Sequence, residues 1–311
     1  MAITTAQALA RAAVTGTGEL LLHAFTPPRV GTTPARQSGA ANRLRRRLAL
    51  IRPDAVVAYD LVDESERTAA ERPCPFSPVV DPAEFARIHL TGCTTPRVLY
   101  RGIGSRTEQE FTRWLAGLPA GTAVVPVGAV APDARMITSL PRAHEIVRIA
   151  RPDILLGGIT VPERHTLGRD EDRRLLLKQR SGCSFFISQL VYDPLPAAAV
   201  AEAYAVRVRA DGLRPAPLIF ALAPCGSPRQ LDLLHWLGVA VPPQVARRLR
   251  TSRDPRRDSS EHCLAVAREL AVVCRGLGLP FGFSVEGLSQ SPADTDAAVR
   301  LAAELGSVLR R

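Results

Sequence analysis

Eight short apolar segments that alternate with helical patterns constrain the fold of this chain more than any other feature of its 311 residues. The apolar segments lie at 20–25, 55–60, 97–101, 122–128, 153–158, 184–189, 217–222 and 281–285. Helical patterns lie at 41–51, 108–118, 140–149, 170–179, 197–209 and 228–236, with further helices at 243–250, 260–277 and 292–309. Parallel strands need a crossover connection, and this alternation therefore predicts repeated βα units.

Eight such units in one chain predict an α/β protein of the (β/α)8 TIM barrel class, with extra helices before the last strand. A doubly wound sheet is the alternative, but its glycine fingerprint is missing, since Gly102-Ile103-Gly104 lacks the third glycine. We expect residues 1–311 to form a single barrel domain. Residues 61–96 include Pro73, Pro75, Pro78 and Pro82 and are expected to form a long βα loop over one face.

Composition excludes several classes of protein. No stretch approaches the length of a membrane span, and residues 1–16 lack the pattern of a secretory signal. The six cysteines form no CxxC pair, which argues against a thiol-bound metal and favours reduced cysteines. We therefore expect a cytoplasmic protein with no metal and no membrane partner.

The net charge of +10 raises the question of a nucleic-acid partner. The arginines are spread along the predicted helices, without an RNA-binding or helix-turn-helix pattern. Only 5% of residues are aromatic, which argues against base stacking as the main purpose. We expect no nucleic-acid partner, and interpret the charge as solvated helix faces together with attraction for an anionic small molecule.

The segment 175–193 has the most specific local pattern. The end of a helix, a break at Gly182 and a buried strand lead to Gln189, at the C-terminal end of the sixth predicted strand. That end of the strands is where α/β barrels place their chemistry. Lys178, on the preceding helix, is the only lysine of the chain, which suggests that a compact ammonium group is required there. A solvated helix charge is the alternative.

Four motifs follow one another along the strands in a specific order. They are Phe25-Thr26-Pro27-Pro28-Arg29, Pro162-Glu163-Arg164-His165, the segment from Lys178 to Asp193, and the segment from Ala223-Pro224 through Gln230 to Val241-Pro242. Each motif alone is weak, but the ordered set resembles the methylenetetrahydrofolate reductase family over most of the chain. Members of that family are (β/α)8 enzymes that reduce a folate-bound methylene to a methyl group.

The resemblance implies a folate site. Gln189 and Gln230 would contact the pterin, since a side-chain amide offers donors and acceptors to a ring edge that carries both. Phe25 and Tyr192 would complete the substrate site. A capping or solvent-facing glutamine is the alternative reading, chiefly for Gln230.

The resemblance also implies a cofactor site. The Pro-Glu-x-His motif and the single lysine correspond to positions near the phosphates and adenosine of the cofactor in flavin-containing members. The implied cofactor residues are Glu163, His165 and Lys178. A loop histidine and a surface lysine are the alternatives for the last two.

The chain departs from the family pattern at three positions. At the position where the family has an acidic residue on the first strand, this chain has Ala24. An alanine cannot protonate the departing folate nitrogen. The adjacent His23 is not a simple replacement, because successive side chains of a strand point to opposite faces. Ala129 stands where flavin-binding members carry aspartate, and Leu288 where the family has a late arginine. We therefore expect the protein to purify without stoichiometric FAD.

Glu286, at the end of the eighth predicted strand, offers another carboxylate. It resembles a glutamate of the flavin-free actinobacterial branch of the family, which passes hydride directly from NADH to the folate. A carboxylate at a strand end of a barrel is a candidate acid, and a structural ion pair is the alternative.

The sequence thus predicts an oxidoreductase that transfers hydride from NADH to a folate-bound methylene, with Glu286 as the catalytic residue. The substrate would be a tetrahydrofolate derivative, and NADH is the expected hydride donor. FAD is the alternative cofactor, against which the residue at position 129 argues. Two alternatives stay open, a folate-binding enzyme of one-carbon or methyl transfer and an inactive folate-binding partner subunit. A homo-oligomer is a further possibility for this chain.

Overall fold

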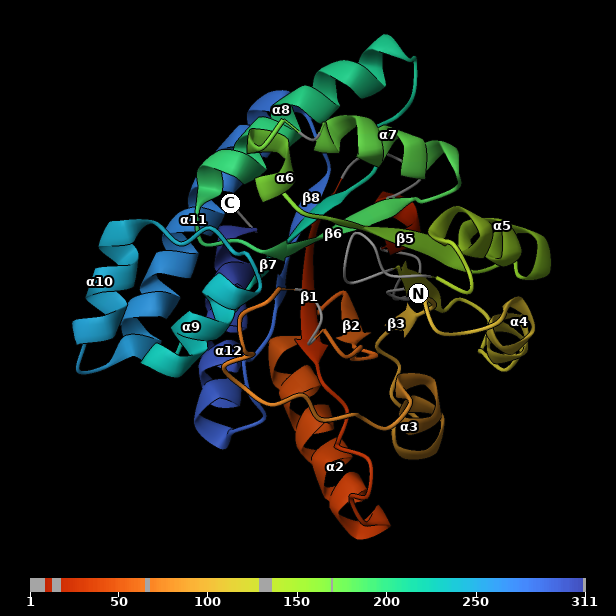
Figure 1. Ribbon diagram of the computed structural model, residues 1–311, viewed down its shortest axis with the longest axis horizontal. Helices are drawn as coiled ribbons and strands as arrows, with labels where there is room; N and C mark the ends of the chain where they lie inside the picture. Colours follow the sequence, from red (N-terminus) through yellow and green to blue (C-terminus); the bar gives the residue numbers. More distant parts are fainter. Residues whose placement is uncertain (1–8, 13–17, 65–67, 129–135, 169, 310–311) are drawn as a thin grey trace.

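Eight parallel strands close into a barrel in the computed structural model, which describes residues 9–12, 18–64, 68–128, 136–168 and 170–309 (Figure 1). The strands are β1 (Glu19–Phe25), β2 (Ala55–Ala58), β3 (Arg97–Gly102), β4 (Ala123–Val127), β5 (Leu155–Thr160), β6 (Phe185–Leu190), β7 (Leu218–Leu222) and β8 (Phe281–Val285). Each strand pairs with the next along the chain, and β1 pairs with β8. The predicted (β/α)8 barrel is confirmed.

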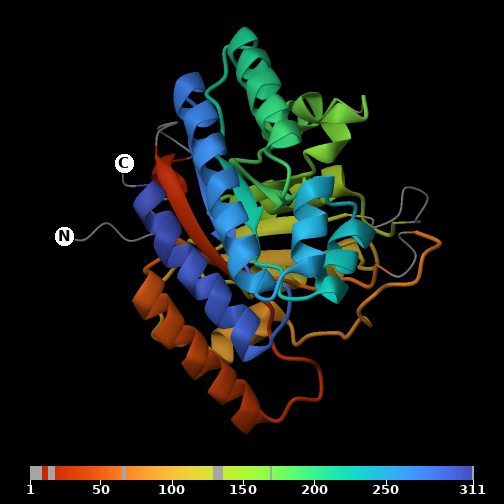
Figure 2. The same cartoon turned by 90° about the vertical axis from the view of Figure 1, so that its left-hand side faces the viewer.

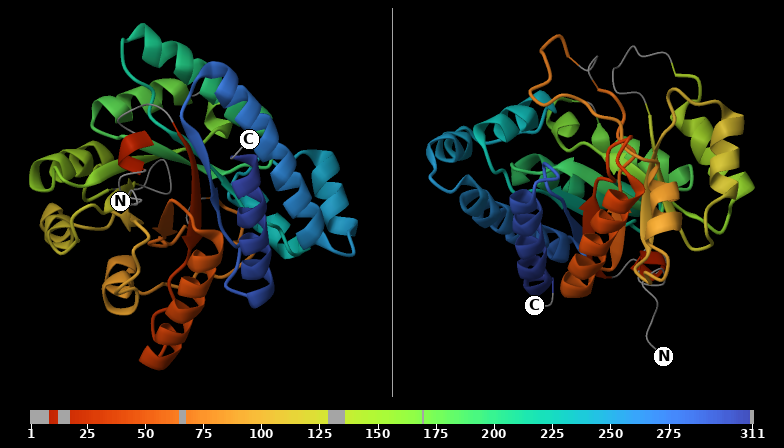
Figure 3. Two further views of the ribbon diagram at one scale, coloured as in Figure 1. Left: turned by 180° about the vertical axis from the view of Figure 1, so that it is seen from behind. Right: turned by 90° about the horizontal axis from the view of Figure 1, so that it is seen from below.

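Helices surround this barrel on its outside (Figure 3). They are α2 (Pro34–Ile51), α3 (Pro82–His89), α4 (Glu108–Ala116), α5 (Leu140–Ala150), α6 (Glu163–Thr166), α7 (Glu171–Arg180), α8 (Pro194–Ala210), α9 (Pro228–Trp236), α10 (Pro243–Thr251), α11 (Pro255–Leu277) and α12 (Pro292–Val308). Three of them, α9 to α11, lie between β7 and β8, which confirms the predicted extra helices. Within the described parts of the chain, no helix has the length and apolar character that crossing a membrane requires.

Alternation along the strands divides the core into two layers. On β1, Leu20, Leu22 and Ala24 belong to the cluster that fills the barrel interior. Phe25 instead packs against the layer between barrel and helices. Both faces of a parallel strand are therefore buried, which explains why the strands read as continuous apolar runs.

Proline marks the first turn of eight of the described helices. The fixed φ angle of proline suits the start of a helix. The N–H group that proline lacks would have no acceptor within the first turn of the helix. The prediction of a continuous loop over 61–96 was wrong for this reason, since Pro82 begins α3 and the Asp81 side chain caps it by accepting from the amides of Ala83 and Glu84. Likewise, α2 begins at Pro34 rather than at residue 41.

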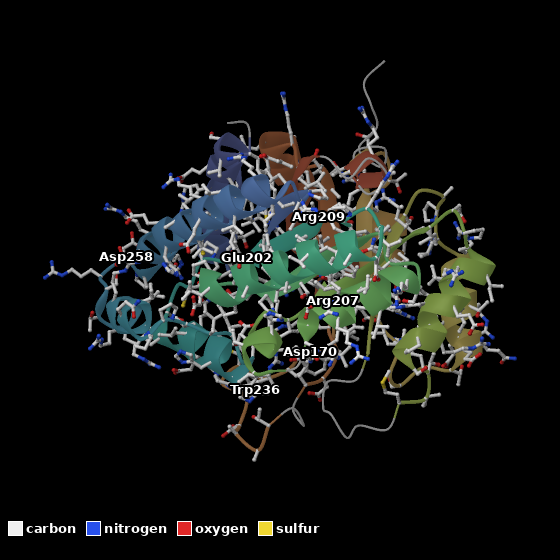
Figure 4. The ribbon with its side chains drawn as sticks, turned by 90° about the horizontal axis from the view of Figure 1, so that it is seen from above. Asp170, Glu202, Arg207, Arg209, Trp236 and Asp258 are labelled. Carbon is white, nitrogen blue, oxygen red and sulfur yellow. The ribbon has the colours of Figure 1, made fainter. Side chains whose placement is uncertain are left out.

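The connection from β2 to α3 reaches the helix that follows β7. The indole Nε1 of Trp236, at the end of α9, donates to the carbonyl of Ala70 over 2.9 Å, beside the loop in Figure 4. The guanidinium of Arg229 donates to the carbonyl of Pro73 over 2.7 Å. These contacts fix the loop at the C-terminal end of the barrel, the end at which (β/α)8 enzymes have their active sites.

Barrel closure leaves no room for a side chain at Gly282. A Cβ there would collide with the backbone carbonyl oxygen of Leu20 and come within 2.8 Å of the Leu20 Cβ. We predict that Gly282→Ala lowers the free energy of unfolding by about 2–3 kcal/mol, because the strand backbone has to move. Chemical denaturation measures this change.

The matched control is Gly276→Ala on α11, where a Cβ would meet no atom within 4 Å. Because alanine favours helix over glycine, this variant should be neutral or more stable by up to about 1 kcal/mol. Equal stability of Gly282→Ala and the wild type would contradict the tight contact between β1 and β8.

Candidate functional site

The C-terminal ends of β8, β2 and β3 bring three polar side chains together. Glu286 follows β8 directly, and its backbone N–H donates to the carbonyl of Leu222 over 3.0 Å. Its Oε1 accepts a hydrogen bond from the hydroxyl of Tyr59, just after β2, over 3.2 Å. The Tyr59 ring packs edge-on against Tyr100 of β3, with ring centroids 4.8 Å apart. A carboxyl group at the end of β8 is therefore held at the barrel mouth by a tyrosine from the end of β2, which packs against a tyrosine of β3.

Ala24 is the neighbour of Glu286 across the closure of the barrel. The register of β1 with β8 pairs His23 with Val285, and the next residues along the two strands are Ala24 and Glu286. Ala24 belongs to the interior cluster. The carboxyl group at this part of the mouth thus comes from the residue after β8 and not from β1.

The surroundings of Glu286 favour its protonated form. Burial raises its pKa to about 7, although the hydrogen bond from Tyr59 acts in the opposite direction. Burial, and then the charge of Glu286, raise the pKa of Tyr59 well above its ordinary value, so this hydroxyl stays a donor. A carboxyl group that gains and loses its proton near neutral pH has the property that a general acid requires.

Gln189 and Glu163 meet at the segment that follows α9. The Nε2 of Gln189 donates to the carbonyl of Leu237 over 2.8 Å, and Oε1 of Glu163 accepts from the amide of Ala240 over 3.1 Å. Among the described residues, Gln189 Oε1 has no protein donor. Burial raises the pKa of Glu163, whose Oε2 is buried without a hydrogen-bond partner. The structure thus brings two of the predicted site residues to one segment.

Gln230 and Tyr192 have partners inside the protein. The Gln230 amide donates to Asp294 over 2.6 Å and accepts from the N–H of Gly226 over 2.5 Å, so both of its ends are engaged. Tyr192 is completely buried, and its hydroxyl donates to the carbonyl of Ala223 over 2.5 Å. The structure does not bring either residue to Gln189, and their contact with a folate stays a prediction.

The other predicted cofactor residues lie beside α7. Lys178 donates to the carbonyl of Ile159, and burial lowers its pKa. His165 Nδ1 lies 3.5 Å from a carboxylate oxygen of Asp172. Lys178 therefore has a protein partner, whereas Nδ1 of His165 is buried without a hydrogen bond. The contact of either residue with a cofactor stays a prediction.

The remaining motif residues lie elsewhere. Phe25 faces away from the barrel interior, with its ring centroid 5.9 Å from that of Phe85 on α3. Leu288 packs, partly buried, against the core. Ala129 lies outside the described residues. No group of three or more histidines, cysteines or acids in the described segments is arranged to hold a metal ion.

Tyr59 and Tyr100 were missed by the sequence analysis. Both stand at the ends of predicted strands on the interior face, so the rule that identified Gln189 also applied to them. A tyrosine at a strand end is as compatible with core packing as with a polar contact, so the pattern alone does not select it. Only the structure reveals that the Tyr59 hydroxyl reaches a carboxylate 227 residues away in the chain.

The whole barrel is similar to that of a folate-binding protein of known structure. That structure is described as an uncharacterized protein from Clostridium thermocellum that binds two copies of 5-methyl-5,6,7,8-tetrahydrofolic acid. The two chains are 27% identical, with a TM-score of 0.83 over 96% of this chain and 99% of the other. The similarity spans both chains.

Other solved structures are similar at the level of overall shape. A Xanthomonas albilineans dihydropteroate synthase matches with a TM-score of 0.46 at 11% identity, over 94% of both chains. An archaeal fructose 1,6-bisphosphate aldolase matches with a TM-score of 0.48 at 10% identity, over 98% of both chains. No protein-family model and no curated protein matches this sequence.

The raised pKa of Glu286 predicts a measurable cost in stability. Its pKa is about 7 in the folded protein against 4.5 ordinarily, so the folded state retains a proton between these values that the unfolded state has released. This carboxyl group therefore reduces stability progressively as the pH rises from 4.5 to 7. We predict that Glu286→Gln matches the wild type near pH 4 and is more stable by about 1–3 kcal/mol near pH 8. Urea unfolding at several pH values measures the difference.

The control for this measurement is Glu202→Gln, an exposed glutamate on the outer helix α8 (Figure 4). It should show no gain in stability that grows with pH. A Glu286→Gln variant that is less stable than the wild type at pH 8 would contradict the buried-acid description.

Proposed function

We propose that this chain binds a reduced folate at the barrel mouth, with Glu286, Tyr59 and Gln189 around the ligand. The observation that carries this proposal is the carboxyl group of Glu286, which directly follows β8 at the barrel mouth and accepts a hydrogen bond from Tyr59. The folate-binding protein that is similar along the whole chain supports the choice of ligand. The free Oε1 of Gln189 supplies an acceptor for a ring N–H group.

Glu286 would deliver a proton to a folate nitrogen. In reduction of a methylene folate, protonation of the departing nitrogen opens the bridge and leaves an iminium on the other nitrogen. Hydride from NADH then adds to the iminium carbon and gives the methyl group. One proton and one hydride are consumed, and NAD⁺ is released. The chain would therefore be a reductase of the methylenetetrahydrofolate type.

Methyl transfer is the second candidate. The similar structure binds a folate that already carries the methyl group. Protonation of the methyl-bearing nitrogen would make the folate a better leaving group when a nucleophile takes the methyl. Ala24 favours this reading, since the acidic residue of the reductases is absent from β1. Glu286 would serve either reaction with the same proton.

For the reductase, we propose NADH as the hydride donor without FAD. Lys178, which the resemblance sets near the flavin phosphates, instead donates to the carbonyl of Ile159, and burial lowers its pKa. His165 lies beside Asp172, but its Nδ1 makes no hydrogen bond. A diphosphate needs charged donors that face it, and Lys178 in this arrangement does not fit that role.

Folate binding can be tested through Gln189. We predict that Gln189→Ala and Gln189→Glu weaken binding of 5-methyltetrahydrofolate by roughly 5- to 150-fold, since a lost paired contact costs about 1–3 kcal/mol. Isothermal titration calorimetry measures the affinity. The control is Gln179→Ala on α7, because the Nε2 of Gln179 also donates to a backbone carbonyl, that of Arg214, over 2.7 Å. Unchanged affinity in both Gln189 variants would remove this residue from the site.

The role of Glu286 predicts a specific pH profile. Because the acid must be protonated, kcat/KM for NADH-dependent reduction of a methylene folate, without added flavin, should fall above pH about 7. Glu286→Gln should lower turnover about 10²–10⁴-fold. It should also abolish this fall in kcat/KM, which we call the alkaline limb of the pH profile. Tyr59→Phe removes the hydrogen bond that lowers the pKa of Glu286, so the limb should move to higher pH.

The control is Tyr100→Phe, which keeps the aromatic packing and should leave the limb in place. A limb that persists in Glu286→Gln would assign the proton to another group. Folate binding without NADH oxidation, together with loss of the methyl group to an added nucleophile, would favour methyl transfer.

A further inference from the structure

A cavity of about 750 Å³ lies on the outside of the barrel, between the end of β1, α2 and the start of α12. Its lining includes Ala24 and Gly287, so one end of it borders the mouth. Helices α2 and α12 run side by side across β1 (Figure 2). We call this cavity the α2–α12 cleft.

The walls of the α2–α12 cleft carry positive charge only. Four arginines line it, and none of the described residues that line it is an aspartate or glutamate. The arginines are Arg29, Arg36, Arg43 and Arg47. The acid nearest to any of them is the exposed Asp296, 3.9 Å from Arg47. Guanidinium groups in this arrangement suit carboxylates or phosphates, which they bind through paired hydrogen bonds.

The arginines and the glycine of α2 lower the stability of this helix. The helix contains five arginines and no acid, so the repulsion between Arg43 and Arg47 at i and i+4 is not offset within the helix. Gly39, between the arginines of this face, weakens the helix by about 1 kcal/mol relative to alanine. An ordinary solvated helix face would mix both signs of charge and avoid glycine. The arrangement is explained if a ligand neutralises the charge.

His23 provides a second, independent feature of the α2–α12 cleft. It lies on the outward face of β1, lines the cleft and is only 2% exposed. Its Nδ1 has no hydrogen-bond partner. Burial and the nearby charge of Arg47 lower its pKa to about 4, so the imidazole is neutral at physiological pH. A buried polar atom without a partner costs free energy, which a bound ligand would recover.

The length of the charged strip limits the ligand. Arg36 and Arg47 are eleven residues apart on one helix face, which spans about 16 Å. A single phosphate or carboxylate cannot contact the whole strip. The ligand needs several anionic groups along an extended chain.

We propose that the α2–α12 cleft binds an extended oligoanion, with its charged groups on Arg36, Arg43 and Arg47 and one polar group on Nδ1 of His23. Linked carboxylates and linked phosphates share this chemistry.

Titration calorimetry with three probes, a tetraglutamate peptide, tripolyphosphate and inorganic phosphate, tests the proposal and distinguishes the two sources. We expect one extended probe to bind at least tenfold more tightly than inorganic phosphate. Arg36→Ser and Arg43→Ser should each weaken that binding about tenfold or more. Because Arg43→Ser also relieves repulsion, it should not lower the melting temperature of the ligand-free protein.

Two further variants make the test specific. Arg46→Ser removes an exposed arginine of the same helix that does not line the cleft, and it should leave binding within about twofold. Gly39→Leu should block binding while the helix keeps its stability, since a Cβ there meets only Nη1 of Arg43, at 3.5 Å. Glu286→Gln, at the mouth, should bind the oligoanion as the wild type does, which separates this site from the folate proposal.

Three results would overturn the proposal. One is that no extended probe binds more tightly than inorganic phosphate. Another is that Arg46→Ser weakens binding as much as Arg43→Ser, which would indicate diffuse attraction to a basic surface. The third is that Gly39→Leu binds the oligoanion normally.

Discussion

Hydrogen bonding between β1 and β8 closes the barrel, and the two candidate sites depend on its register. The pairing of His23 with Val285 sets Ala24 beside Glu286 on the interior face. Because side chains alternate along a strand, the same register turns His23 outward into the α2–α12 cleft. One strand thus borders a carboxyl group on its inner side and a strip of arginines on its outer side. A shift of one residue would exchange the two faces.

The sequence was informative wherever one local rule decided the structure. Strands buried on both faces appear as apolar runs, and the predicted strand ends at Gln189 and Glu286 agree with the observed ends of β6 and β8. Their roles in a site stay predictions. The start of α2 and the whole of α3 were missed because proline suits a loop and the first turn of a helix equally well. The hydrogen bond from Gln230 to Asp294 joins residues 64 positions apart, and no local pattern contains it.

An alanine at position 24 beside Glu286 has a physical consequence for the carboxyl group at the mouth. A carboxyl group at both 24 and 286 would place two like charges side by side, and they would share a single proton. With Ala24, the proton affinity of Glu286 depends on burial, which raises its pKa, and on the Tyr59 hydroxyl, which lowers it. The balance lies near neutral pH, where an acid can give up a proton and regain it.

Part of the net charge of +10 is concentrated in the α2–α12 cleft. Several arginines elsewhere are paired, as Arg142 is with Glu108 and Arg151 with Asp153. The α2–α12 cleft has no such acids among its described lining residues, and its border includes Gly287, next to the acid at the mouth. A positive field beside the mouth would attract any anionic ligand toward both sites. Because salt screens such a field within about 10 Å at 0.1 M, exposed arginines would steer ligands, while the half-buried Arg47 would hold them.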